Sequence, residues 1–302
     1  MNRIIIIQGT TASGKSSLAV SLARDIDCSI ISADSRQFYK EMNMGTAKPS
    51  IDEMKGVPHY FIDSHSIHER TMTSADFMRS GRQKIDQLFQ DGSENIIVTG
   101  GSGMFIDALV DGLHPSPQSP EVRDQIQNEW KEKGIDSLLE ELKMKDAQSY
   151  RNMDINNPMR ILRALEVIRV SGKTLDEIRK LPKERIPYPI TRFCVNWDRK
   201  DLYDRINLRV DQMMNEGLYD EIMNLPVQGN LLLQNTVGYK EWLLHFEGKK
   251  SKEEVVELIK KNTRNYAKRQ ETWLRRYSDL IYLNPYEKRS LKDQLLTHLN
   301  SE

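Results

Sequence analysis

The run Ile4-Ile5-Ile6-Ile7-Gln8, followed directly by Gly9-Thr10-Thr11-Ala12-Ser13-Gly14-Lys15-Ser16, decides the fold of this chain. Its second part matches the phosphate-binding pattern G-x-x-x-x-G-K-[ST] in full. The isoleucines predict a buried strand and residues 17–23 an amphipathic helix, which is the context this loop needs. Backbone N–H groups in such a loop hold phosphate oxygens, Lys15 adds a positive charge and the Ser16 hydroxyl can bind Mg²⁺. The segment therefore predicts a site for a diphosphate or triphosphate, such as that of ATP; a chance glycine-rich turn is the weaker alternative.

Strands and helices alternate along the first part of the chain. The pattern predicts strands at Ile4–Gln8, Ser29–Ala33 and Asn95–Thr99, a fourth that completes the sheet at Ile190–Asn196, and helices at Lys15–Asp25 and Ser74–Asp91, with Ser74 as N-cap. We therefore expect an α/β fold with a P-loop NTPase-like parallel sheet flanked by helices. Ligands of such sheets bind at the carboxyl ends of the strands, so the phosphate loop, Asp34 and the turn Gly100–Gly103 should surround one cleft.

A proline-rich stretch at residues 114–120 is typical of a linker. The segment after it predicts helices only: Glu121–Lys133, Ile135–Lys145, Asn157–Val170 and Leu175–Lys180. We expect a helical insertion domain at residues 114–189 within a P-loop-like core formed by residues 1–113 and 190–302. Two or three further helices are predicted in the second part of this core: Lys200–Asn215, Leu218–Asn224 and Lys252–Tyr277.

The composition is that of an ordinary globular protein, with 29% charged and 38% hydrophobic residues. We find no apolar run long enough to span a membrane and no leader peptide, and we expect a cytoplasmic location. Cys28 and Cys194 stand alone, and the six histidines lack the spacing of a metal site. A net charge of zero argues against a nucleic-acid-binding surface over the whole protein, but basic residues exceed acidic ones after residue 150, which permits a local one.

Two side chains at the expected cleft could take part in chemistry. Asp34 follows the second strand and is placed to act as a general base, or else as a helix N-cap. Ser102 could hydrogen-bond the bridging oxygen of a diphosphate, or the turn simply requires small residues. The strand Asn95–Thr99 ends without the carboxylate that P-loop ATPases use. ATP hydrolysis is therefore disfavoured, whereas a small-molecule kinase still fits.

Basic residues of the second half could bind phosphates. Arg205 and Arg209 share one helix face, where they could close over a diphosphate or pair with the aspartates Asp201, Asp204 and Asp211. The segment Thr263–Arg276 is basic with interleaved aromatic residues, which suits a helix that packs on the core and faces a polyanion. Most basic helix faces are merely solvated, so both readings stay open at this point.

Eight segments together resemble the motif set of one family: Gly9–Ser16, Asp34–Gln37, Asn43–Pro49, Gly56–Asp63, Gly100–Phe105, Asn157–Val167, Val237–Glu241 and Thr263–Trp273. The family is that of the tRNA dimethylallyltransferases, the bacterial-type isopentenyltransferases, and the resemblance extends over about residues 3–280. It implies an enzyme, a prenyl transferase, that moves a dimethylallyl group from dimethylallyl diphosphate to the N6 amine of adenosine 37 in tRNA.

The resemblance also implies roles for individual residues. Asp34 and Ser102 would be catalytic, Asp34 as the general base, and Mg²⁺ would bind at Ser16. The donor diphosphate would be bound by Gly9, Thr10, Thr11, Ala12, Ser13, Gly14, Lys15, Ser16, Arg205 and Arg209. The tRNA would be contacted by Asp34, Ser35, Arg36, Gln37, Ser102, Arg123, Met159, Arg160, Ile161, Leu162, Arg163, Arg264, Lys268 and Arg269. The expected partners are tRNA and dimethylallyl diphosphate, and the expected state is a monomer without membrane contact.

Three positions depart from the family pattern. Thr10 replaces the usual proline after the first glycine, Ser102 replaces a threonine and keeps its hydroxyl, and Met159 replaces a glutamine whose amide could contact RNA. Three other functions remain to be separated from this one. A small-molecule kinase would use residues 1–110, a relative that prenylates free adenine nucleotides would need no RNA contacts, and a non-catalytic RNA-binding module would need no Lys15, Ser16 or Asp34.

Overall fold

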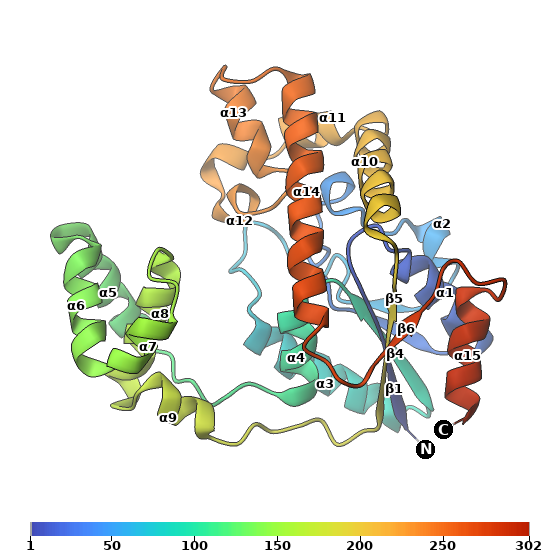
Figure 1. The fold of residues 1–302 in the computed structure, drawn as a ribbon, viewed down its shortest axis with the longest axis horizontal. Coiled ribbons are helices and arrows are strands. Elements are labelled where there is room, and N and C mark those ends of the chain that lie inside the picture. The colour runs from blue at the N-terminus through green and yellow to red at the C-terminus, as the bar shows by residue number, and fades with distance from the viewer. Residues whose placement is uncertain (1, 302) are drawn as a thin grey trace. The chain divides into compact units, whose positions relative to one another are not determined.

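The computed structural model describes residues 2–301, and a six-stranded parallel sheet forms the centre of the larger of its two compact units (Figure 1). The strand order is β3-β2-β4-β1-β5-β6, with bounds β1 Arg3–Gln8, β2 Ser29–Ser32, β3 His59–Tyr60, β4 Asn95–Gly100, β5 Ile190–Val195 and β6 Leu280–Leu283. This sheet confirms the predicted P-loop NTPase-like α/β fold. The expectation that Ile190–Asn196 completes the sheet is wrong, because β6 pairs with β5 beyond it. A four-residue edge strand is too short for a periodic signal.

Helices cover both faces of the sheet. On one face α1 (Lys15–Asp25) and α15 (Leu291–Ser301) pack Leu22 and Leu295 against Ile5 and Ile97 of the strands. The other face carries α3 (Ser74–Gln90) and α4 (Gly103–Asp111) (Figure 1). α15 lies beyond the last helix predicted from the sequence. In the described part of the chain, no helix combines the length and apolarity needed to cross a bilayer.

The N-cap of α3 is Thr73, not Ser74 as predicted. The Thr73 hydroxyl accepts the N–H of Asp76 at 3.2 Å, and the Asp76 carboxylate accepts the N–H of Thr73 at 3.0 Å. This reciprocal box needs an acidic residue three positions after the cap. Thr73 has Asp76 at that position and Ser74 has Phe77, so the acidic residue decides between two adjacent hydroxyls.

The sheet belongs to a compact unit that is formed by the chain up to Val110 and from Pro187 onward. This unit also contains the remaining helices that surround the sheet. Three of these helices match predicted ones: α10 Arg199–Asn215, α11 Leu218–Met223 and α14 Lys252–Leu274. The others are short: α2 Ile51–Met54, α12 Leu231–Gln234, α13 Leu243–Phe246, η1 Met44–Thr46, η2 Val227–Gly229 and η3 Lys240–Trp242. Cys28 and Cys194 are both buried here, and burial raises the pKa of each thiol to about 12.

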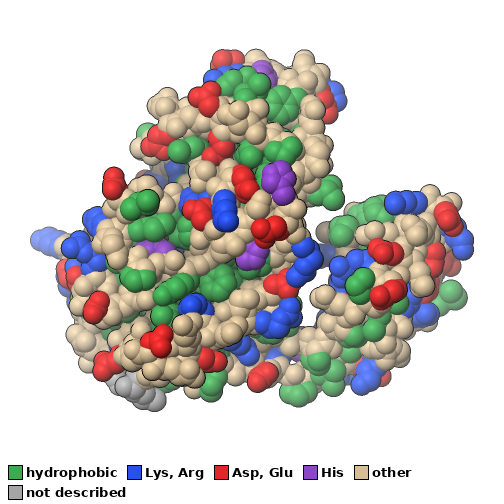
Figure 2. Space-filling model, turned by 180° about the vertical axis from the view of Figure 1, so that it is seen from behind, with side chains coloured by type: hydrophobic (Ala, Val, Ile, Leu, Met, Phe, Trp, Pro, Cys, Tyr) green, Lys and Arg blue, Asp and Glu red, His purple; other side chains and the backbone are tan. Residues whose placement is uncertain are grey.

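The second compact unit is Asp111–Ile186 and is wholly helical. It consists of α5 Pro120–Lys133, α6 Ile135–Lys145, α7 Ala147–Asn152, α8 Pro158–Ser171 and α9 Leu175–Lys180. Its own core packs Ile126 of α5, Leu142 of α6 and Leu165 of α8 together. On the face drawn in Figure 2, basic and acidic side chains are interspersed, as the neutral net charge leads one to expect.

Candidate active site

The register of the strands brings three loops to one edge of the sheet. Gln8 of β1 pairs with Gly100 of β4, and Ser32 of β2 pairs with Thr99. The phosphate loop after β1, the turn after β4 and the segment from Asp34 after β2 therefore begin at the same level. The Ala33 N–H donates to the Thr99 carbonyl at 2.7 Å, which continues the pairing of β2 with β4 up to the residue before Asp34.

The phosphate loop is held by groups far away in the sequence. The Trp197 ring N–H donates to the Ser13 carbonyl at 2.9 Å, Arg205 Nε donates to the Ala12 carbonyl at 2.9 Å, and the Thr11 N–H donates to Gln270 Oε1 at 2.9 Å. Gly14 begins α1 with φ +89, a conformation that glycine adopts without strain. The loop is therefore fixed by α10 and α14 as well as by its own turn.

Lys15 lies buried at the start of α1, and its Nζ donates to the Thr10 carbonyl at 3.2 Å. Burial lowers the pKa of Lys15 to about 8, although the nearby charge of Asp34 acts in the opposite direction and that of Arg209 adds to the lowering. A buried ammonium with few anions around it favours an anionic ligand. Ser16, the next residue, is exposed.

Two cavities meet at this point. The large cavity, about 700 Å³, lies between α1, the segment 43–54 and α10. The small cavity, about 300 Å³, is lined by residues 34–37, α10, residues 235–238 and α14. Both are lined by Lys15, Ser16, Arg209 and Met213. A ligand bound at Lys15 and Ser16 can therefore extend into either cavity.

Asp34, Arg36 and Gln37 line the small cavity, as does Ser35. The Asp34 carboxylate accepts the N–H of Arg36 at 3.0 Å, so it stabilises its own turn and does not cap a helix. Its charge also influences Lys15, Arg209 and Tyr266. The predicted base thus shares a cavity with the predicted phosphate-binding groups.

Ser102 does not line either cavity. Its Oγ accepts the N–H of Ser35 at 3.1 Å and bonds the Ser35 hydroxyl at 3.1 Å. Tyr266, an aromatic residue of the basic segment to which no site role was assigned, interacts with Ser102 and lines the small cavity. Burial, and secondly the charge of Asp34, raises its pKa to about 12. Ser102 thus supports the Asp34–Gln37 turn, and any contact with a leaving group stays a prediction.

The glycines of the turn after β4 are needed because α14 packs against them. A Cβ on Gly101 would lie 2.3 Å from Gln270 Nε2, and one on Gly103 would lie 2.2 Å from the Trp273 ring. Gln270 also donates to the Gly101 carbonyl at 2.9 Å. Close approach of a helix, and not only the tightness of the turn, explains why small residues stand here.

Replacing Gly103 by alanine is therefore expected to lower the free energy of unfolding by about 1–3 kcal/mol, the usual cost of overpacking. The matched control is Gly229→Ala, because a Cβ at Gly229 has no heavy atom within 4 Å among its described neighbours. Urea unfolding of both variants measures the difference. Equal stability of the two variants would show that Trp273 moves aside at no cost.

Arg205 bonds the phosphate loop, and Arg209 lines both cavities together with Lys15. The alternative in which they pair with nearby aspartates is therefore wrong. Besides its bond to Ala12, the Arg205 guanidinium lies 4.3 Å from the centre of the Trp197 ring. Arg209 donates to the Ala47 carbonyl at 3.3 Å, and burial lowers its pKa. Asp201 instead bonds Tyr286, and Asp211 pairs with Lys260.

The basic helix α14 divides its cations between two directions. Arg269 lines the small cavity, with its guanidinium 5.6 Å from the centre of the Tyr266 ring. Arg264 and Lys268 instead lie over Tyr203 of α10, and Arg264 donates to Asn207 Oδ1 at 2.6 Å. Neither of these two lines the large or the small cavity, whereas Arg269 does line the small one. Their contact with tRNA stays a prediction.

In the helical unit, Arg123 and Arg163 converge on Glu166. Arg123 Nη2 lies 2.9 Å and Arg163 Nη1 2.8 Å from Glu166 Oε2. Burial of Glu166 opposes its charge, but the hydrogen bonds from both arginines hold its pKa below the ordinary value. Both arginine side chains are partly exposed, and they share the single carboxylate of Glu166. The cluster therefore carries a net positive charge that could bind a further anion.

The segment 159–163 is split between surface and core. Met159 is 64% exposed and Arg160 is exposed as well, whereas Ile161 and Leu162 pack in the core of the unit. The side chain of Ile161 is fully buried and that of Leu162 is 5% exposed, so they offer RNA almost no side-chain surface. Within residues 2–301, no three His, Cys, Asp or Glu side chains gather as a metal site.

Two segments of the motif set, Asn43–Pro49 and Val237–Glu241, were given no site role but contribute to the cavity walls. Tyr239 packs on Gly45, where a Cβ would lie 2.5 Å from the ring, and its hydroxyl donates to Glu221 at 2.6 Å. Burial and the charge of Glu221 raise the pKa of Tyr239. Gly45 and Gly238 both line the small cavity. The motif residues were visible in the sequence, but their mutual contact was not.

Comparisons with known proteins agree with this geometry. A family model described as IPP transferase matches residues 37–277. The tRNA dimethylallyltransferase of Cytophaga hutchinsonii is 39% identical over 285 residues, which cover 94% of this chain and 93% of the relative, and tRNA dimethylallyltransferase 1 of Bacteroides thetaiotaomicron is 37% identical over 100% of this chain and 99% of the relative. The crystal structure of the full-length tRNA isopentenylpyrophosphate transferase from Bacillus halodurans superposes with a TM-score of 0.71 at 30% identity and covers 100% of this chain and 95% of that one. The chain belongs to the IPP transferase family.

Proposed function

We propose that this protein transfers the dimethylallyl group of dimethylallyl diphosphate to the N6 amine of adenosine 37 in tRNA and releases diphosphate. The observation that carries the proposal is the meeting of two cavities at Lys15, Ser16 and Arg209. A donor diphosphate bound at this junction can present its C1 carbon to an adenine in the small cavity. Asp34 lines that same cavity.

In the transfer step the lone pair of N6 forms a bond to C1 of the dimethylallyl group. The bond between C1 and the diphosphate oxygen breaks, and its electron pair leaves with the diphosphate. Asp34 accepts the proton of the N6 amine, because an exocyclic amine is a poor nucleophile while it keeps that proton. Lys15, Arg205 and Arg209 stabilise the charge that develops on the leaving diphosphate.

Mg²⁺ is the proposed cofactor. At phosphate sites it takes one or two protein oxygens and completes its shell with substrate oxygens and water. The exposed Ser16 hydroxyl beside Lys15 fits this requirement. Bound there, Mg²⁺ would neutralise part of the diphosphate charge.

The tRNA is proposed to contact the protein at two places. Residues 34–37 and Arg269 would surround the adenosine, which has to leave its stack to enter the small cavity. Extrusion is less costly from an unpaired anticodon loop. The exposed Met159 and Arg160 and the arginine pair Arg123 and Arg163 would contact the anticodon stem-loop. The proposed state is a monomer, and a tRNA substrate favours the cytoplasm.

The test uses radiolabelled dimethylallyl diphosphate, Mg²⁺ and unmodified tRNA, with AMP and ATP as parallel acceptors. Label is expected in tRNA and not in the free nucleotides, and a tRNA with guanosine at position 37 should stay unlabelled. Label in AMP or ATP would favour a nucleotide prenyltransferase. A folded protein that labels no acceptor but phosphorylates one from ATP would favour a kinase.

A further inference from the structure

The segment Asn43–Lys48, here called the partition, separates the two cavities. Asn43, Met44, Ala47 and Lys48 line the large cavity, whereas Gly45 and Thr46 line the small one. Its backbone is a single 3-10 turn, and Ala47 has a left-handed φ of 46. The N–H groups of Thr46, Ala47 and Lys48 bond carbonyls within the segment, which sets its shape. Its place between the two cavities depends on contacts with other parts of the chain.

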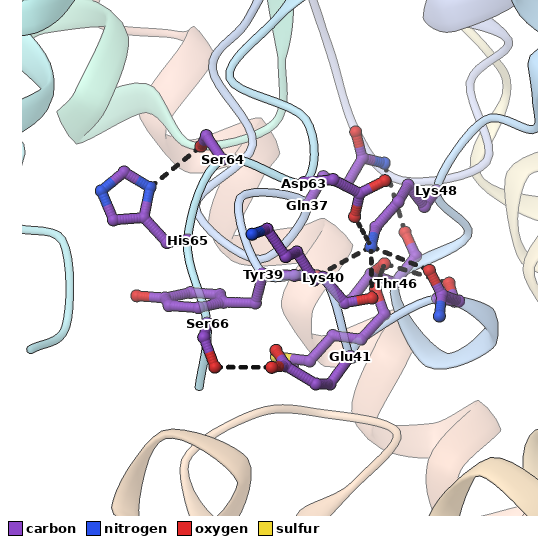
Figure 3. Close-up of polar contacts among 12 residues, drawn as sticks. Gln37, Tyr39, Lys40, Glu41, Thr46, Lys48, Asp63, Ser64, His65 and Ser66 are labelled. Carbon is purple, nitrogen blue, oxygen red and sulfur yellow. Dashed lines mark hydrogen bonds and ion pairs between the residues drawn. The ribbon is translucent and has the colours of Figure 1, made fainter. Parts of the chain in front are cut away.

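Lys48 is at the centre of these contacts (Figure 3). Its Nζ donates to the Tyr39 carbonyl at 2.7 Å, to Asn43 Oδ1 at 2.8 Å and to the Lys40 carbonyl at 3.3 Å, and it forms an ion pair with Asp63. The Lys48 side chain is only 5% exposed. An ammonium has three hydrogens, and four acceptors surround this one. Lys48 therefore lines the large cavity but has its charge engaged inside the protein.

The partition is also bonded to residues of the proposed reaction. Gln37 Nε2 donates to the carbonyls of Thr46 at 3.3 Å and Ala47 at 3.2 Å, and Arg209 donates to the same Ala47 carbonyl at 3.3 Å. From the other side, the Glu221 carboxylate accepts the N–H groups of Asn43 at 3.0 Å and Met44 at 2.8 Å. The position of the partition thus sets the positions of Arg209, at the proposed diphosphate site, and of Gln37, at the proposed adenosine site.

We infer that Lys48 is a positioning residue: its ammonium fixes the partition, and the partition carbonyls hold Arg209 and Gln37 in register with Lys15 and Asp34. The inference rests on the proposed prenyl transfer. A displacement of about 1 Å between reacting groups can lower a rate on the order of 10²-fold while binding is maintained. A lysine that binds the donor itself would instead act mainly on donor affinity.

The test replaces Lys48 by methionine, which keeps the length and removes the N–H donors. At saturating donor and tRNA, kcat is expected to fall by about 10- to 100-fold, while the dissociation constant of inorganic diphosphate with Mg²⁺, measured by calorimetry, stays within about threefold. Lys40→Met is the matched control, because Lys40 is a nearby lysine outside the partition with an exposed side chain. Only its backbone carbonyl, which the substitution keeps, contacts Lys48. It should behave as the unmodified protein in both measurements.

Three results would overturn the inference: an unchanged kcat in Lys48→Met, a diphosphate affinity that falls tenfold or more in that variant, or an equal loss of kcat in Lys40→Met. If Lys48→Met does not fold, Asn43→Ala removes a single acceptor and should lower kcat several-fold at unchanged diphosphate affinity; an unchanged kcat there would again contradict the inference.

Hydrogen exchange distinguishes this inference from the proposed function. The amides of Thr46, Ala47 and Lys48, which bond Asn43 and Met44 carbonyls, should exchange faster in Lys48→Met than in Lys40→Met. This measurement needs no activity. If exchange is faster in Lys48→Met but the unmodified protein transfers no prenyl group, only the proposed function is contradicted. If the unmodified protein is active but exchange in Lys48→Met is unchanged, only the role of Lys48 is contradicted.

Discussion

Replacing Asp34 by asparagine is expected to lower kcat for transfer by about 10²- to 10⁴-fold, the usual contribution of a general base. Asparagine keeps the size of the side chain and an oxygen that can accept the N–H of Arg36, now bonded at 3.0 Å. The turn at residues 34–37 should therefore persist while the proton acceptor is lost. Single-turnover transfer to tRNA measures the rate, and filter binding measures tRNA affinity, which should stay within several-fold.

The control for this variant is Asp52→Asn, an equal change of charge at an exposed residue of α2 that lines neither cavity. Its rate and affinity should match those of the unmodified protein. If Asp34→Asn loses tRNA affinity by as large a factor as it loses rate, Asp34 is a binding residue and a different group accepts the proton.

Replacing Lys15 by methionine is expected to raise the donor KM by roughly 10- to 100-fold, since hydrogen bonds to a charged group contribute about 1.5–3 kcal/mol. Lys15 is buried where both cavities meet, so its loss leaves the diphosphate without its nearest fixed ammonium. The matched control is Lys55→Met, at an exposed lysine beside α2. A donor KM and rate that equal those of Lys55→Met would remove Lys15 from the donor site.

The lowered pKa of Lys15 adds a pH dependence with a definite sign. Because the protonated ammonium binds the diphosphate and its pKa in the free protein is about 8, donor affinity should be maintained below this value and fall as the pH rises through it. The fall should be absent in Lys15→Met. The same fall in both proteins would show that it belongs to the ionisation of the donor or of another residue.

The parts of the fold that depend on neighbouring residues could be predicted from the sequence. The isoleucines of β1, the loop and α1 adjoin one another, so a single pattern predicts all three. Helices such as α6 and α9 were predicted with their observed bounds because they are periodic and have clear ends. β6 was missed because a four-residue edge strand carries little periodic signal. α15 was missed although Leu291, Leu295 and Leu299 recur at helical spacing.

The contacts that shape the site could not be predicted, since they join residues far apart in the chain. Gln270 and Thr11 are separated by 259 positions, and Arg205 reaches Ala12 over 193. Arg205 and Arg209 of α10 would have the same i, i+4 spacing whether they paired with aspartates on an exposed helix face or pointed toward the phosphate site. Only the packing of α10 beside the phosphate loop decides between the two, and no local pattern reports that packing.

The two cysteines have a practical consequence for following the protein in solution. Cys28 and Cys194 are buried with thiol pKa values near 12, so at neutral pH almost none of either is thiolate, the form that reacts with alkylating dyes. A single cysteine introduced at an exposed position, such as Met159, would therefore take up a fluorophore selectively in the otherwise native chain. Such a conjugate would report RNA arriving at the helical unit in real time, without first removing any natural thiol.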